Sequence, residues 1–259
     1  DLHSFPTRRS SDLFHSVHCR KGGRTKLNFT ILRKESPEIS AHWQTIAFDA
    51  DETMTIASVL TALNQILDLK DIDGNAVRLP IRWESSCLQK KCGACAMVIN
   101  GKPSLACDVR ISSLTKCREI RIEPLRKFPI VADLIVDRSI LFENLKALKL
   151  WFDETTGTEG EIAYEASRCL QCGCCLEVCP NFYAGGEFFG MSAFVPISRI
   201  LTNLPESQKK EIYHDYRKYL YEGCGKSLAC RNICPAGIDI DKLLVNSNAV
   251  AVWKRFFRK

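Results

Sequence analysis

Eleven of the fourteen cysteines in this chain fall into three spacing patterns. The pattern C-x4-C-x2-C-x11-C comprises Cys87, Cys92, Cys95 and Cys107. The pattern C-x2-C-x2-C-x3-C-P comprises Cys169, Cys172, Cys175 and Cys179, and the pattern C-x5-C-x3-C-P comprises Cys224, Cys230 and Cys234. Thiolate sulfur is the usual protein ligand of iron–sulfur clusters, and these spacings are typical of plant-type and bacterial-type ferredoxins. The cysteine pattern therefore predicts a chain that binds three clusters and transfers electrons.

Length and composition narrow the class of protein. The 259 residues suffice for two domains of ordinary size. No apolar run approaches the roughly 20 residues of a membrane-spanning helix, so we expect the chain not to cross a bilayer by itself. The formal net charge of +6 is modest, and without a clustered basic patch we expect no nucleic-acid partner. Disulfide frameworks do not produce two runs that each end in Cys-Pro, which favours a reducing cytoplasm with most thiols committed to metal.

Residues 1–25 differ from the rest of the chain. The stretch DLHSFPTRRSSDL has no hydrophobic period, and the HSVHCRKGGRT that follows it is basic and Gly-rich. The first stretch resembles a translated sequencing-adapter artefact, so we predict a non-native or disordered leader over residues 1–25. An authentic, disordered basic leader is the alternative.

Residues 26–123 are expected to form a β-grasp domain of the plant-type ferredoxin kind. Alternating polar and apolar side chains predict strands at 26–34 and 42–50, and apolar residues at helical spacing predict a helix over 55–67. The cysteine-rich loop follows, then a strand at 96–100, a turn at Asn100-Gly101 and a closing strand at 119–123. Two strands, a helix, a metal loop and further strands indicate this fold.

Residues 124–138 are expected to connect the first domain to a helical second domain at 139–259. Helical patterns lie at 139–152, 197–204, 207–222 and 239–252. The two runs that end in Cys-Pro begin about 55 residues apart and look like a degenerate internal repeat of a two-cluster ferredoxin. We therefore predict an α+β chain whose second domain is an all-α, bacterial-type two-cluster ferredoxin.

The first cysteine pattern predicts a [2Fe–2S] centre held by four thiolates. Cys87, Cys92 and Cys95 form a tight loop in which Gly93 relaxes the backbone, and Cys107 arrives from the next hairpin. A zinc site is the alternative, although zinc knuckles favour paired C-x2-C units.

The second and third patterns are read together, because the fourth cysteine of each run in two-cluster ferredoxins ligates the other cluster. This crossing predicts a [4Fe–4S] cluster held by Cys169, Cys172, Cys175 and Cys234. It leaves Cys179, Cys224 and Cys230 for the third cluster. A full run would carry another cysteine at position 227, where this chain has Ser227. Three thiolates favour a [3Fe–4S] cluster, and a serine-ligated [4Fe–4S] cluster is the alternative.

Three cysteines are not expected to be ligands. Cys174 directly precedes Cys175, so its side chain points away from the ligand set and we predict a small buried apolar residue. Cys19 and Cys117 have no partner at ligand spacing and are expected to be free thiols.

Over residues 26–253 the chain resembles the iron–sulfur subunits of succinate dehydrogenase and fumarate reductase. The segments that carry the resemblance are CLQKKCGAC…LAC, IEPLRKFPIVADLIVDRS, CLQCGCCLEVCPN and CGKSLACRNICPAGI. The resemblance implies relay of electrons from an FAD-containing flavoprotein subunit through the three clusters to a quinone at a cytochrome b-type membrane anchor. The chain itself has no Gly-rich dinucleotide fingerprint, so the flavin belongs to another chain. A subunit of this kind would lie on the cytoplasmic face of the cell membrane without a transmembrane helix of its own.

The chain departs from several family members near the expected quinone end. A tryptophan after the second Cys-Pro and a histidine after Cys224 are absent, and the CPN and CGKS forms resemble the Gram-positive, menaquinone-linked branch. Pro180, Tyr183 and Lys226 are the candidate residues near a quinone. The tail 253–259 mixes aromatic and basic residues and fits either a membrane or anchor contact or a solvated terminus. A soluble, thiol-linked fumarate reductase is the alternative function.

Overall fold

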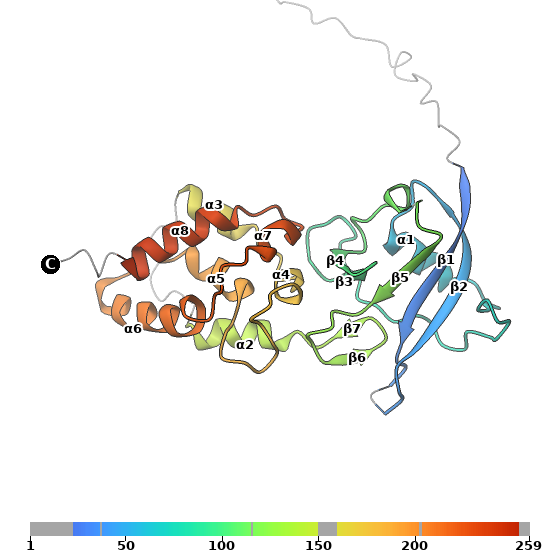
Figure 1. The fold of residues 1–259 in the computed structure, drawn as a ribbon, viewed down its shortest axis with the longest axis horizontal. Coiled ribbons are helices and arrows are strands. Elements are labelled where there is room, and N and C mark those ends of the chain that lie inside the picture. The colour runs from blue at the N-terminus through green and yellow to red at the C-terminus, as the bar shows by residue number, and fades with distance from the viewer. Residues whose placement is uncertain (1–22, 37, 115, 150–159, 202–203, 254–259) are drawn as a thin grey trace, which may run out of the picture.

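The computed structural model describes residues 23–36, 38–114, 116–149, 160–201 and 204–253. Figure 1 shows a sheet-containing half that runs from β1 to β5 and a helical half that runs from α2 to α8. The short β6–β7 hairpin lies between them. The predicted α+β class, with strands first and helices second, is confirmed.

The first half is a five-stranded mixed sheet in the order β2-β1-β5-β3-β4. Its strands are β1 (Arg24–Arg33), β2 (His42–Asp51), β3 (Ala96–Ile99), β4 (Lys102–Leu105) and β5 (Glu119–Glu123). β1 pairs antiparallel with β2 and parallel with β5, as a β-grasp requires. At the β3–β4 turn Asn100 and Gly101 both have positive φ, the geometry that favours this dipeptide in tight hairpins. Arg24 and Thr25, which we assigned to the leader, instead begin β1.

The helix that crosses the sheet is α1 (Ile56–Leu63), four residues shorter at its C-terminal end than predicted. The Thr55 hydroxyl caps its first turn by accepting a hydrogen bond from the Ser58 amide. Asn64 ends it, because this side chain exchanges two 2.8 Å hydrogen bonds with the Ile81 backbone. Leu67, which the apolar spacing placed in the helix, is 99% exposed.

The connecting segment is packed against the sheet rather than extended as a linker. It forms β6 (Ile130–Ala132) and β7 (Ile135–Val136), and Leu125, Phe128 and Leu134 are buried with the core of the sheet. A buried ion pair anchors it, in which Arg33 Nε lies 3.0 Å from Asp133 Oδ1. The same carboxylate accepts hydrogen bonds from the amides of Lys34 and Arg82.

The helical half comprises α2 (Ser139–Ala147), α3 (Glu161–Ser167), α4 (Cys174–Glu177), α5 (Met191–Ser198), α6 (Glu206–Tyr216), the π-helical η2 (Arg217–Tyr221), α7 (Ala229–Ile233) and α8 (Ile240–Ala251). One further 3₁₀ turn, η1 (Ile111–Ser113), lies in the first half. The helices predicted at 207–222 and 239–252 are confirmed. The helix predicted at 139–152 ends at Ala147, and positions 150–152 fall outside the described residues.

The helix predicted at 197–204 is wrong: α5 spans Met191–Ser198 and begins six residues earlier. Seven of its eight residues are buried, including two serines, so the helix is buried on all sides and has no amphipathic stripe that a sequence pattern could detect. Pro196 lies inside this helix, a position where proline is disfavoured because its ring nitrogen has no hydrogen to donate.

The two halves share packed side chains. The core that holds the sheet, α1 and the connecting segment also includes Cys172, Cys174, Leu176 and Phe182 from the helical half. A second core is built by α5, α6, η2 and α8. The loop that carries the second cysteine pattern therefore packs against the sheet-containing half.

Candidate functional site

The 87–95 loop places three predicted ligand cysteines around a backbone that turns repeatedly through left-handed conformations. Leu88, Lys90 and Gly93 all have φ between 52° and 74°. These turns aim amide groups at sulfur: the amides of Gln89 and Lys91 each lie 3.3 Å from Cys87 Sγ. Amide donors of this kind stabilise thiolates, as metal ligation requires.

Cys107 joins this loop from beyond β4. Its sulfur accepts a hydrogen bond of 3.3 Å from the Lys90 amide, and Cys92 Sγ accepts one of 3.5 Å from the Ala94 amide. The structure therefore brings the four cysteines of the first pattern to one edge of this loop.

The thiols of this group lie in different electrostatic environments. The backbone donors of Gln89 and Lys91 lower the pKa of Cys87 to about 7. Burial raises the pKa of Cys95 to about 12. Cys92 is exposed at the surface. A cysteine must lose its thiol proton to bind a metal, so metal binding at Cys95 must displace a proton from a thiol with a raised pKa.

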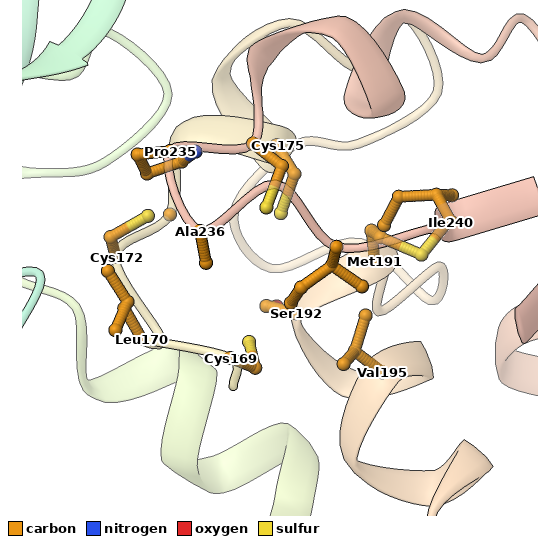
Figure 2. A pocket seen from close by; sticks show the side chains of 13 residues that line it. Cys169, Leu170, Cys172, Cys175, Met191, Ser192, Val195, Pro235, Ala236 and Ile240 are labelled. Atoms are coloured by element: carbon orange, nitrogen blue, oxygen red, sulfur yellow. The ribbon is translucent and has the colours of Figure 1, made fainter. Parts of the chain in front are cut away.

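The second group of thiols lines a cavity in the helical half, shown in Figure 2. Cys169, Cys172, Cys175 and Cys234 all contribute to its wall, so the structure brings Cys234 from the third pattern to three cysteines of the second. Most other lining residues are apolar, including Met191, Val195 and Ile240. Burial raises the pKa of Cys169 to about 11 and that of Cys175 well above its ordinary value.

The third group of thiols lines a separate cavity. Cys179, Cys224 and Cys230 share it with Ser227, the residue at the position of the missing cysteine. Burial raises the pKa of Cys230 to about 11. Lys226 and Leu228 flank Ser227 in left-handed conformations, so this loop turns sharply around the cavity. Cys234 therefore lies with Cys169, Cys172 and Cys175, and Cys179 lies with Cys224 and Cys230.

Two of the three candidate quinone residues line the third cavity, and the third lies outside its wall. Pro180 and Lys226 line the third cavity. Tyr183 does not contribute to that wall in the described part of the chain; it is 67% exposed, and its ring lies against Gly186.

The donor chemistry of these groups fits iron–sulfur clusters. The candidate ligands of each set are thiols, surrounded by backbone amides in the first set and mainly by apolar side chains in the second. The third cavity also contains the polar side chains of Asn181, Lys226 and Ser227. Within the described ranges, no three His, Cys, Asp or Glu side chains are arranged to hold a single metal ion.

The first and second groups lie in direct contact. A Cβ atom at Gly93 would lie 2.7 Å from the Leu170 carbonyl oxygen and 2.9 Å from Cys172 Cβ. Gly93 adjoins Cys92, so only a glycine allows the two ligand loops to pack this closely. Nothing in the cysteine spacing indicated this contact, because it joins positions almost 80 residues apart.

Arg138 holds the two loops together. Its guanidinium donates to the carbonyl oxygens of Gly93 and Ala94 at 3.0 and 3.1 Å, and to that of Cys172 at 3.4 Å. It also forms an ion pair with Glu84. The planar fork of arginine suits a site with several converging acceptors, which a lysine could not serve equally. We did not single out this residue from the sequence, although it lies in the FPIVADLIVDRS segment.

The remaining cysteines agree with their predicted environments where they are described. Cys174 is fully buried in the core shared by the two halves, as predicted, but its thiol hydrogen-bonds to Cys172 instead of pointing away from the candidate ligands. Cys117 is exposed. Cys19 lies outside the described residues.

Comparison with known proteins identifies both halves. Residues 28–143 match the family described as a 2Fe-2S iron-sulfur cluster binding domain, and residues 165–238 match a 4Fe-4S dicluster domain. The succinate dehydrogenase iron-sulfur subunit of Bacillus subtilis is 36% identical over 200 residues, which cover 69% of this chain and 77% of that protein. The chain belongs to the family of succinate dehydrogenase and fumarate reductase iron–sulfur subunits.

Other members of this family support the assignment. The fumarate reductase iron-sulfur subunit of Haemophilus influenzae is 30% identical over 238 residues, covering 82% of this chain and 88% of that protein. A chain in the solved Mycobacterium smegmatis Sdh1 complex has the same fold, with a TM-score of 0.71 at 20% identity over 90% of this chain and 98% of that one. The predicted family, fold and enzyme class are therefore confirmed. None of the helices in the described residues is long and apolar enough to span a membrane.

Proposed function

We propose that this iron–sulfur subunit relays electrons between a flavoprotein subunit, which interconverts succinate and fumarate, and a quinone at a membrane anchor. The observation that carries the proposal is the serial arrangement of three thiol groups. The first touches the second through Gly93, Leu170 and Cys172, and the second and third cavities share Met191 as a wall residue.

The proposed ligand sets follow the three groups. Cys87, Cys92, Cys95 and Cys107 would hold a [2Fe–2S] cluster, and Cys169, Cys172, Cys175 and Cys234 a [4Fe–4S] cluster. Cys179, Cys224 and Cys230 would hold a [3Fe–4S] cluster, since Ser227 supplies no thiolate for a fourth iron. When bound, the clusters supply one-electron redox chemistry, which suits transfer between a two-electron flavin and a quinone.

The surrounding residues would position and protect these centres. The amides of Gln89, Lys90 and Lys91 stabilise negative charge on the sulfurs of the first group. Arg138 holds the first two ligand loops at contact distance. Apolar side chains around the second cavity exclude water, which keeps the local dielectric low and the cluster environment fixed.

The quinone end is proposed to lie at the third cavity. Pro180 and Lys226 line it, and Lys226 contributes the positive charge there, its ammonium group 5.1 Å from the centre of the Tyr221 ring. We propose menaquinone as the quinone, a cytochrome b-type subunit as the anchor and the cytoplasmic face of the membrane as the location, because the CPN and CGKS segments resemble the menaquinone-linked branch. The tail at 254–259, a candidate anchor contact, lies outside the described residues.

Electron paramagnetic resonance with iron quantification on the anaerobically purified protein tests the assignment. We expect a three-iron signal in the oxidised sample, two further signals after dithionite reduction, and roughly nine irons per chain. About ten irons without the oxidised signal would mean that Ser227 or water completes a second four-iron cluster. A native sample that contains zinc and gives no signal would refute electron transfer altogether.

A further inference from the structure

One polar side chain lines the otherwise apolar wall around the thiols of the second cavity, and a second polar side chain hydrogen-bonds to one of those thiols. Ser192, in the first turn of α5, is 1% exposed and lines the cavity among the thiols (Figure 2). Its hydroxyl oxygen is buried and has no hydrogen-bond partner in the described structure. A buried hydroxyl without a partner is energetically unfavourable, so we expect the Ser192 hydroxyl to have a partner when the site is occupied.

Gln171 is the second polar residue, in the loop between Cys169 and Cys172. Its side-chain amide donates to Cys169 Sγ at 3.2 Å and to the Ser192 carbonyl oxygen at 2.9 Å. One amide group therefore connects a predicted ligand sulfur to the first turn of α5. The Gln171 backbone has a φ of 49°, a left-handed conformation that is uncommon for residues other than glycine and that turns the loop sharply at this position.

Both residues offer hydrogen-bond donors to sulfur. The Gln171 amide already contacts Cys169 Sγ, and the Ser192 hydroxyl can rotate to donate to an acceptor inside the cavity. A cluster gains one negative charge when it is reduced, so a donor to its sulfurs stabilises the reduced state more than the oxidised state. Hydrogen bonds to sulfur are one of the means by which proteins set cluster potentials.

We propose that Ser192 and Gln171 are tuning residues that raise the reduction potential of the [4Fe–4S] cluster, Ser192 by donating its hydroxyl hydrogen into the cavity and Gln171 by donating to Cys169 Sγ. This inference rests on the ligand set proposed above. Neither residue is a candidate ligand. Among the described residues, Ser192 is the polar side chain in the otherwise apolar wall around these thiols, and Gln171 hydrogen-bonds to one of their sulfurs from outside that wall.

The test is an anaerobic redox titration of the whole complex followed by electron paramagnetic resonance. Ser192→Ala and Gln171→Leu should each shift the potential of the [4Fe–4S] cluster to more negative values, and the double variant should shift it further. The other two cluster potentials should stay unchanged. Ser192→Thr, which keeps the hydroxyl, should retain the wild-type value.

Ser198→Ala is the matched control. Ser198 is equally buried on the same helix, but its hydroxyl donates to the Phe194 carbonyl and lies 3.0 Å from Ser247 Oγ, not at the cavity. A wild-type potential in both Ser192→Ala and Gln171→Leu would overturn the proposal. Equal shifts in Ser192→Ala and Ser198→Ala would also overturn it, because they would indicate a general packing effect. Failure of the underlying ligand assignment is distinguishable, since wild-type protein would then show no four-iron signal to titrate.

Discussion

Gly93→Ala is the substitution that most directly tests the contact between the first two ligand loops. Gly93 has φ of +74°, and its Cβ would lie 2.7 Å from the Leu170 carbonyl oxygen and 2.9 Å from Cys172 Cβ. The left-handed conformation alone costs an alanine about 1–2 kcal/mol. Forcing backbone atoms apart adds about 1–3 kcal/mol, giving roughly 2–5 kcal/mol in all.

This cost is smaller than the stability of most domains, so we expect the protein to remain folded and the loops to separate instead. Leu170 O and Cys172 Cβ must each move by roughly half an ångström or more to reach ordinary van der Waals contact with the new methyl group. Two reduced clusters held by these loops interact magnetically with a strength that falls as the inverse cube of their separation. Gly93→Ala should therefore weaken the spin–spin splitting and slow electron transfer between them, with cluster content unchanged.

Gly101→Ala is the matched control, because Gly101 has φ of +77° and nothing within 4 Å of the Cβ position. Gly101→Ala therefore carries the free-energy cost of a left-handed alanine but not the cost of a steric clash. Urea unfolding of both holoproteins should show a lower midpoint for Gly93→Ala, the difference corresponding to about 1–3 kcal/mol. Equal midpoints and an unchanged spin–spin splitting would refute the claim that a glycine is required at this contact.

Three further substitutions test other parts of the structure. Cys87→Ser should remove the [2Fe–2S] signal, retain the other two and abolish quinone-linked succinate turnover; full turnover would contradict the relay. Ser227→Cys should add a fourth thiolate, raise the iron content by about one per chain and remove the oxidised three-iron signal; an unchanged iron count would argue against the crossed ligand sets. Asp133→Ala should destabilise the fold by about 3–5 kcal/mol in urea unfolding, because it leaves the buried Arg33 guanidinium without its ion-pair partner. Glu143→Ala, which breaks an exposed ion pair, should cost less than about 1 kcal/mol, and an equal loss in both variants would contradict this reasoning.

The strands and most of the site were predictable because their determinants are local. Alternation along β1 and β2 reflects one buried face of the sheet, and the short ligand spacings reflect a loop that must wrap a compact centre. The proposed crossing of Cys179 and Cys234 follows from the duplicated pattern. The structure places Cys234 beside cysteines of the second pattern and Cys179 beside cysteines of the third.

The features that escaped prediction depend on contacts between distant segments. α1 ends early because Asn64 bonds to Ile81, and α5 could not be located because its burial on all sides leaves no periodic pattern. The role of Arg138 could not be predicted, because its hydrogen-bond acceptors come from two loops that are distant in the sequence and meet only in the folded protein. The unpartnered Ser192 hydroxyl likewise becomes meaningful only when the cavity wall is assembled around it.

The relative position of the first two ligand loops is set by direct packing and not by the length of a linker. Cys172 and Leu176 belong to the same core as the sheet, and the connecting segment is fastened to that sheet by Arg33 and Asp133. Arg138, immediately beyond that segment, bonds to both loops. A change in the connecting segment should therefore lower the stability of both halves together. A change at Gly93 should lower stability and also separate the two ligand loops, because the added methyl group lies directly at their contact.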